Sequence, residues 1–165
     1  NSALCVAADG NGAIFVSTHP NGGAAAWKRY LVDPPAADDS FSAVVCPTIR
    51  LCLAAASGSA GNILFSSTDP TGGAHAWKGT RGVDQSLPLV ALACLSESYC
   101  LAEDVATDVV SATNPTGGAS AWTTSFTGGE GGNHLRGGAS CQSAMLCVAV
   151  GARNVVTSTD PLGAP

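Results

Sequence analysis

Short runs of apolar residues recur along the whole chain, separated by glycine, proline, asparagine and aspartate. In one unit of the pattern they predict strands over Phe41–Cys46, Leu51–Ala56, Asn62–Ser67 and Ala76–Thr80. These runs are about five residues long and rich in β-branched and aromatic residues, which favour strands. No window carries the i, i+3, i+4 apolar spacing of a helix, and glycine and proline recur too often for long helices. The pattern therefore predicts an all-β chain.

The predicted strands belong to an internal repeat. The phrase Gly-Gly-Ala-x-Ala-Trp ends at Trp27, Trp77 and Trp122, with spacings of 50 and 45 residues. A Thr-x-Pro step precedes each phrase, and a further copy of that step spans Thr159–Pro161. Four short strands in roughly 47 residues are typical of one blade of a β-propeller. We therefore predict a β-propeller made of four-stranded antiparallel blades.

The repeat also predicts where the blades begin and end. We expect a first blade over 1–40 that lacks its first strand, complete blades over 41–86 and 87–134, and a partial blade over 135–165. Closed propellers typically have four to eight blades. Three blades and part of a fourth are thus expected to form an arc of a larger ring. The chain would either be part of a longer one, which we favour, or assemble with copies of itself.

The most regular copy of the repeated phrase runs from Ser67 to Trp77, Ser-Thr-Asp-Pro-Thr-Gly-Gly-Ala-His-Ala-Trp. It resembles the Asp-box, or BNR repeat, of sialidase-type propellers, with extra residues between the glycine and the tryptophan. The strand rhythm also resembles the photosystem-II assembly-factor type of BNR-like propeller. We interpret the boxes as structural turns, with calcium or glycan binding as the alternative. His19 and Asn114 replace the aspartate and Ala112 replaces the serine in other copies, which argues against a uniform ligand role. The structural positions are Ser67, Asp69, Gly72, Trp77, Trp27, Trp122 and Asp160.

Six of the seven cysteines form Cys-x5-Cys pairs. Each pair spans the hairpin between the first two strands of a blade, where two cysteines lie within reach of a disulfide. Zinc is the rival interpretation, but zinc sites usually combine shorter C-x2-4-C knuckles that meet in space. We therefore predict disulfides and no metal or other cofactor. Cys5 aligns with the second member of each pair, and its mate would fall just before residue 1. The predicted bridges are Cys46–Cys52, Cys94–Cys100 and Cys141–Cys147.

Net charge and hydropathy limit the classes of partner that the chain is expected to bind. The 165 residues carry a net charge of −5 with only 7 lysines and arginines, which argues against nucleic acid because phosphates need clustered cations. The longest apolar run, near Leu87–Leu95, is far shorter than the roughly 20 residues that cross a bilayer, so membrane insertion is not expected. Disulfides imply an oxidising compartment. We therefore predict a secreted or cell-surface protein.

The repeats differ most at the end of the blades opposite the cysteines, in the second-to-third turns and the connections between blades. Loops on a rigid scaffold commonly carry binding groups. The sequence thus predicts a non-catalytic binding or structural scaffold for further blades of the same or another chain, a glycan or an extracellular protein. The alternative is a fragment of a sialidase-like glycoside hydrolase with catalytic residues partly outside this chain, although no arginine cluster or catalytic residue is evident. Candidate binding residues are Tyr30, Arg81, Glu103, Asp104, His134 and Arg136.

Overall fold

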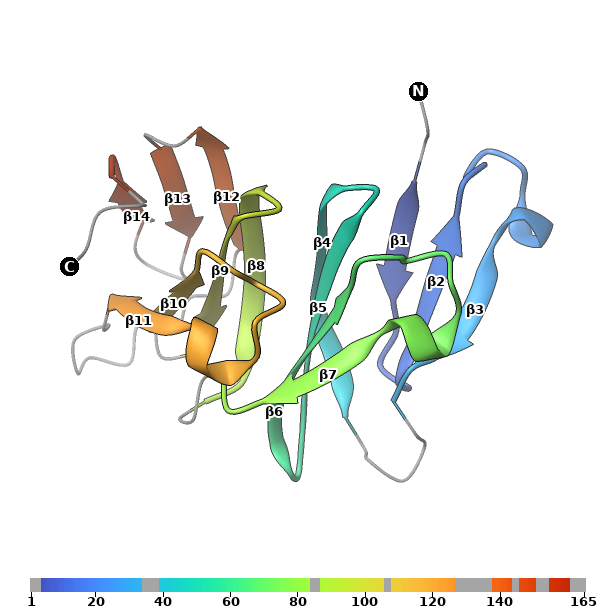
Figure 1. Cartoon of the computed structure of the whole chain (residues 1–165), viewed down its shortest axis with the longest axis horizontal. Helices are drawn as coiled ribbons and strands as arrows, with labels where there is room; N and C mark the ends of the chain where they lie inside the picture. Colours follow the sequence, from blue (N-terminus) through green and yellow to red (C-terminus); the bar gives the residue numbers. More distant parts are fainter. Residues whose placement is uncertain are drawn as a thin grey trace.

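A computed structural model describes residues 4–33, 39–83, 87–105, 108–126, 138–143, 146–150 and 155–160. Its strands form four antiparallel sheets, and each sheet is built from consecutive segments of the chain. The sheets follow one another in chain order across the molecule, from the first near the N-terminus to the last near the C-terminus (Figure 1). The all-β prediction is confirmed.

Each sheet is an up-and-down meander with its strands in sequence order. The first sheet contains β1 (Cys5–Ala8), β2 (Ala13–Ser17) and β3 (Lys28–Leu31), and the second contains β4 (Ser40–Thr48), β5 (Leu51–Gly58), β6 (Gly61–Ser67) and β7 (Lys78–Arg81). The third contains β8 (Leu89–Ser96), β9 (Tyr99–Asp104), β10 (Val109–Ala112) and β11 (Thr123–Phe126), and the fourth contains β12 (Gly138–Ser143), β13 (Leu146–Val150) and β14 (Val155–Ser158).

The strand register shows that the sheets are copies of one another. Cys5 pairs with Ser17 in the first sheet as Cys52 pairs with Ser67 in the second and Cys147 with Ser158 in the fourth. β1 therefore corresponds to β5, β9 and β13. Within the described ranges, the first sheet has no counterpart of β4, and the fourth has no counterpart of β7.

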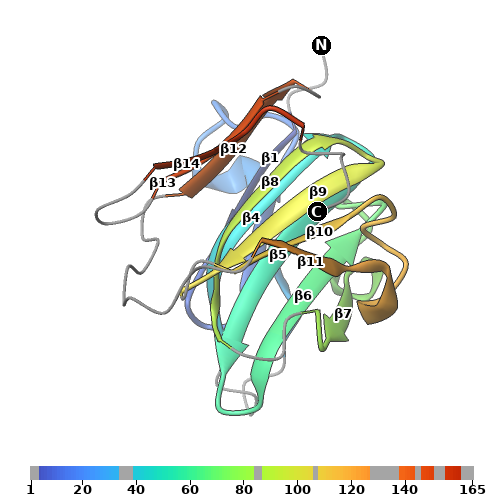
Figure 2. The same ribbon diagram turned by 90° about the vertical axis from the view of Figure 1, so that its left-hand side faces the viewer.

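The sheets stack face to face, and their first strands run beside one another, with β4 against β8 and β8 against β12 (Figure 2). Small side chains allow this close stacking, because Ala54, Ala55 and Ala56 of β5 are fully buried. Apolar clusters fill each gap between sheets. The rigid stack holds the turns at both ends of the strands in fixed positions.

The repeated tryptophan phrase forms a compact turn rather than the start of a strand. Its first alanines form short 3-10 turns, such as Ala74–Ala76, so β7 begins at Lys78 and not at the predicted Ala76. The second glycine of each phrase has a positive φ, 95° at Gly73, which side chains other than glycine rarely adopt. Trp77 then packs on the preceding sheet with 5% of its surface exposed.

The polar residues that precede the two glycines of the phrase make hydrogen bonds inside these turns. Ser67 Oγ accepts the backbone N–H of Asp69, and Asp69 Oδ1 accepts the hydroxyl of Thr71 at 3.0 Å. In the third sheet Asn114 Oδ1 accepts the Thr116 hydroxyl in the same way, at 3.3 Å. A carboxylate and an amide are interchangeable in this contact, as expected for a residue that closes a turn.

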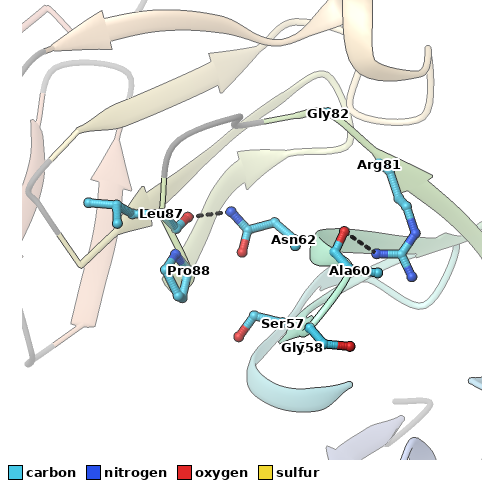
Figure 3. A pocket seen from close by; sticks show the side chains of 10 residues that line it. Ser57, Gly58, Ala60, Asn62, Arg81, Gly82, Leu87 and Pro88 are labelled. Atoms are coloured by element: carbon cyan, nitrogen blue, oxygen red, sulfur yellow. Dashed lines mark hydrogen bonds between the residues drawn. The ribbon is translucent and has the colours of Figure 1, made fainter. Parts of the chain in front are cut away.

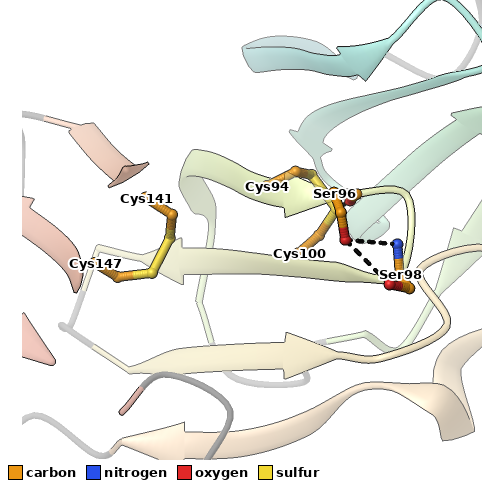
Figure 4. The surroundings of a disulfide bond; sticks show 6 residues. All are labelled: Cys94, Ser96, Ser98, Cys100, Cys141 and Cys147. Atoms are coloured by element: carbon orange, nitrogen blue, oxygen red, sulfur yellow. Dashed lines mark hydrogen bonds between the residues drawn. A yellow bond between two sulfur atoms is a disulfide. The ribbon is translucent and has the colours of Figure 1, made fainter. Parts of the chain in front are cut away.

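The three predicted disulfides are present, each across the hairpin between the first two strands of a sheet. Their Cα atoms are 4.0–4.1 Å apart. Cys94–Cys100 and Cys141–Cys147 lie on neighbouring sheets (Figure 4). Cys5 is a free, half-buried thiol.

Candidate functional site

The stacked sheets have two chemically different ends. At one end, which we call the cystine end, the disulfide hairpins and the tryptophan turns lie together. Ile49 and Arg50 of the β4–β5 turn line the same groove as Thr68 and Asp69 of a tryptophan turn. At the loop end lie the β1–β2, β5–β6 and β9–β10 turns, with the end of β7 and the residues that enter β8 beside the β5–β6 turn. The candidate site lies at the loop end.

A pocket of about 380 Å³ opens at the loop end of the second sheet (Figure 3). Its floor is the β5–β6 turn, where glycines and serines leave backbone groups accessible. The end of β7 and the segment entering β8 form its walls. The lining residues are Ser57, Gly58, Ser59, Ala60, Gly61, Asn62, Arg81, Gly82, Leu87 and Pro88.

Arg81 is the charged group of this pocket, and two acceptors fix its guanidinium. Its Nη2 lies 3.0 Å from Asp39 Oδ2 in an ion pair, and its Nη1 donates to the Ala60 carbonyl oxygen at 3.3 Å. The Asp39 side chain is fully buried and its Oδ1 lacks a hydrogen-bond partner, whereas 42% of the Arg81 side chain is exposed. A guanidinium has five N–H donors. The exposed part of Arg81 therefore retains donors for a ligand.

Asn62 builds the wall opposite Arg81. Its Nδ2 donates to the Leu87 carbonyl oxygen, and its Oδ1 accepts the Leu89 N–H at 3.3 Å. The side chain thus pairs with the backbone of the next sheet as a neighbouring strand would. This contact holds the entry to β8 beside the β5–β6 turn and keeps the pocket open.

Glu103 and Asp104 are adjacent on β9, so their side chains point to opposite faces of the strand. Glu103 lies on the same face as Tyr99 and Leu101, which pack on the fourth sheet. Asp104 Oδ1 accepts the Asp108 N–H at 2.9 Å and closes the β9–β10 turn, as Asp9 Oδ1 closes the β1–β2 turn. The sequence predicted both acids in one candidate binding surface, but in the structure they lie on opposite faces of β9.

Glu103 is a fully buried carboxyl, and neither of its oxygens has a hydrogen-bond partner. Burial raises the pKa of this group from 4.5 to about 7. The register places Ala8 and Ala55 at the equivalent positions of the first two sheets. The first two sheets thus have an apolar alanine where the third has the ionisable Glu103.

The other candidates fall in different places. Tyr30 is not in a loop, as the sequence suggested, but in β3, where its hydroxyl donates to the Thr71 carbonyl oxygen of the next sheet at 3.1 Å. It joins two sheets and is directed toward a tryptophan turn. His134 and Arg136 lie outside the described residues. Of the four predicted binding residues that the structure describes, Arg81 alone lines the pocket.

Sequence reasoning missed the partners that organise the pocket. Asp39 and Arg81 are 42 residues apart and belong to opposite edges of the sheet β4-β5-β6-β7, and Arg81 also contacts the β5–β6 turn between them. Asn62 carried no signal beyond its place after Gly61.

Among the described residues there is no group of three His, Cys, Asp or Glu side chains that could hold a metal ion. In that same part of the chain, no helix has the length and apolarity needed to cross a bilayer.

Comparison with known proteins agrees with this architecture. No protein-family model matches the sequence, and no curated protein matches it. A structure of YCF48 bound to a D1 peptide superimposes with a TM-score of 0.69 over 96% of this chain and 48% of the other, at 12% identity. YCF48 from Cyanidioschyzon merolae gives a TM-score of 0.64 over 98% of this chain and 52% of the other, at 11% identity.

The chain therefore has the β-propeller fold that its repeat predicted, with open sheets that form part of a propeller. It spans about half the length of the two similar structures. At such low identity the likeness defines the fold, and the site must be interpreted from this chain's own residues.

Proposed function

We propose that this chain is a non-catalytic propeller scaffold that binds an extended acidic peptide segment at the loop-end pocket. The observation that carries the proposal is the partly exposed side chain of Arg81, whose guanidinium is held at the pocket by Asp39 and Ala60. Such a group forms charge-assisted hydrogen bonds with a carboxylate, either of an acidic side chain or of a chain terminus. The peptide backbone would lie across the serine and glycine backbone of the β5–β6 turn.

Two further observations support a peptide ligand. The pocket is shallow and bordered by the apolar Leu87, 37% exposed, and by Pro88, so it suits a narrow chain with one polar and one apolar contact. A structure with the same fold, YCF48, is bound to a D1 peptide. The disulfides favour an oxidising compartment, and we propose that the protein acts in one, as a secreted or cell-surface scaffold.

The test measures binding of fluorescent extended peptides that end in a free carboxylate, each compared with its amidated form. Because Arg81→Gln alone would leave Asp39 buried and unpaired, the variant carries Asp39→Asn as well. We expect the double variant to bind the carboxylate peptides at least about tenfold more weakly, since a hydrogen bond to a charged group contributes roughly 1.5–3 kcal/mol.

Arg50→Gln is the matched control, because Arg50 is an exposed arginine at the cystine end of the same sheet. It should bind like the unmodified chain, and urea unfolding should confirm that the double variant is folded. Equal binding by the double variant and the unmodified chain, or no preference for a free carboxylate, would contradict the proposal.

A further inference from the structure

The loop end of β9 carries a buried carboxyl without a partner. Glu103 is 0% exposed, and neither of its oxygens has a hydrogen-bond partner among the described residues. It shares a face of β9 with Tyr99 and Leu101, which pack on the fourth sheet. An unpaired buried carboxyl is tolerated in its neutral form, because burial of an isolated charge costs far more. The protonation state of Glu103 therefore decides whether it fits its site.

The strands that surround Glu103 offer it no opposite charge. β8, β10, β12 and β13 contain no lysine, arginine, histidine, aspartate or glutamate, and their cysteines are bridged. On β9 itself, Asp104 points to the opposite face, and Asp108 meets it at the β9–β10 turn. Burial raises the pKa of Tyr99, so this phenol stays neutral while Glu103 titrates near pH 7. Among the described groups on this face of β9, Glu103 alone changes charge there.

Backbone hydrogen bonds connect this end of β9 to the wall of the loop-end pocket. In the antiparallel pair of β8 and β9, Leu89 lies opposite Asp104, the residue after Glu103. One residue further along, the Val105 N–H donates to the Pro88 carbonyl oxygen at 3.0 Å. Pro88 lines the pocket (Figure 3). The end of β9 therefore holds the segment that forms this wall.

The second sheet holds the same wall from the other side. The Leu89 N–H donates to Asn62 Oδ1 at 3.3 Å, and the Leu89 carbonyl oxygen accepts the Ser42 hydroxyl at 2.7 Å. The register of β8 is irregular between Leu89 and Ala91, directly opposite the end of β9. Such an irregularity interrupts the hydrogen-bond ladder locally. Few bonds thus hold the end of β9 to the wall, and it can separate without unfolding of the sheet.

We propose that Glu103 is a pH-dependent switch of the loop-end pocket. Its protonated form keeps the end of β9 against Pro88 and Leu89, whereas its ionised form draws that end away from β8 to reach water, so ligands bind more weakly as pH rises. The effect on ligands rests on the proposed function of the pocket. The opening of the strand end requires no ligand, so the two can be tested separately.

The pKa of Glu103 sets the size of the effect. With a pKa of about 7 in its buried site and 4.5 in water, an ionised Glu103 favours the opened strand end by up to about 300-fold. Below pH 4.5 the carboxyl is protonated in both forms and favours neither. Because coupling between two sites is reciprocal, a ligand that binds the closed form must in turn raise the pKa of Glu103.

Amide chemical shifts of the whole chain, followed from pH 5.5 to 8.5 without ligand, test the switch itself. We expect the Leu89 and Val105 amides and the Asn62 side-chain amide to titrate together, with a midpoint near pH 7. Asn62 belongs to the second sheet, so its response reports movement of the wall rather than the presence of a nearby charge.

Glu103→Gln and Glu103→Ala cannot ionise, and both should abolish this titration. Two variants are used so that a folding defect in one does not decide the result. Glu97→Gln, at an exposed acid on the β8–β9 turn, is the matched control and should titrate like the unmodified chain. Titration of the Asn62 amide in the Glu103 variants, or a response confined to residues 103–105, would overturn the proposal.

A carboxylate peptide then tests the coupling to a ligand. An acetylated peptide with a free carboxyl terminus and no histidine does not itself titrate between pH 5.5 and 8.5. Its affinity for the unmodified chain should fall at least about threefold over this range, and its affinity for Glu103→Gln should stay constant. Binding to the unmodified chain that does not depend on pH would overturn the proposal. Absence of binding at every pH would instead contradict the proposed function, and the Asn62 titration would still decide whether Glu103 moves the wall.

Discussion

Replacement of Glu103 by glutamine should remove a pH-dependent loss of stability. Burial raises the pKa of Glu103 from 4.5 to about 7 in the folded chain, where neither carboxyl oxygen has a hydrogen-bond partner. Below pH 4.5 the group is protonated in both the folded and the unfolded state and has no effect. Between pH 4.5 and about 7 the folded state alone keeps the proton, so the free energy of unfolding falls as pH rises.

The size of the effect follows from the difference between the two pKa values. Above pH 7 the penalty for ionising Glu103 in its buried site should reach about 3 kcal/mol. For a chain of this size that corresponds to a difference in Tm of about 10 °C. Glutamine has nearly the same shape and cannot ionise, so Glu103→Gln should match the unmodified chain at pH 4.5 and exceed its stability by that amount at pH 8.

Urea unfolding at several pH values between 4.5 and 8.5 measures the difference directly, because other titrating groups cancel between the two chains. Glu97→Gln is the matched control, since Glu97 lies on the exposed β8–β9 turn. Glu103→Ala, which installs the residue found at the equivalent positions of the first two sheets, should also flatten the profile. Parallel profiles for the unmodified chain and Glu103→Gln would refute the reasoning.

Three further experiments test contacts within and between the sheets. Trp122→Ala should cost about 3 to 5 kcal/mol in urea unfolding because the ring is buried against the preceding sheet, whereas Trp27→Ala, at a half-buried ring, should cost clearly less. Replacing both Cys94 and Cys100 by alanine should lower stability by about 2 kcal/mol, the entropy of closing so short a loop, and a reducing agent should then have a smaller effect on Tm. Tyr30→Phe should cost about 1 kcal/mol by thermal unfolding through loss of one hydrogen bond between sheets, and no change would show that the contact contributes nothing.

Local patterns in the sequence predicted the fold well. A tryptophan turn is complete within about ten residues of chain, and a disulfide hairpin within seven, so their spacing carries the whole geometry. Gly73 and Trp77 are needed wherever the turn recurs. The repeat spacing therefore predicts both the sheets and their disulfides without any information on tertiary contacts.

The site was harder to predict because it depends on contacts between distant segments. Asp39 follows one connection and Arg81 ends the outer strand of the same sheet, so no local pattern joins them. Glu103 replaces an alanine within a short strand, and in the sequence it looks like a loop acid. Tyr99 and Leu101, on the same face of β9, pack on the fourth sheet, which is about 40 residues further along the chain.

A peptide titration followed by amide chemical shifts tests the central claim most directly, because it locates the ligand on the whole chain. With a carboxylate peptide, binding at the loop-end pocket predicts the largest shift changes in Ser57–Gly61, Arg81 and Leu87, with little change at the cystine end around Ile49 and Arg50. Changes centred on the cystine end, or none at saturating peptide, would contradict the account.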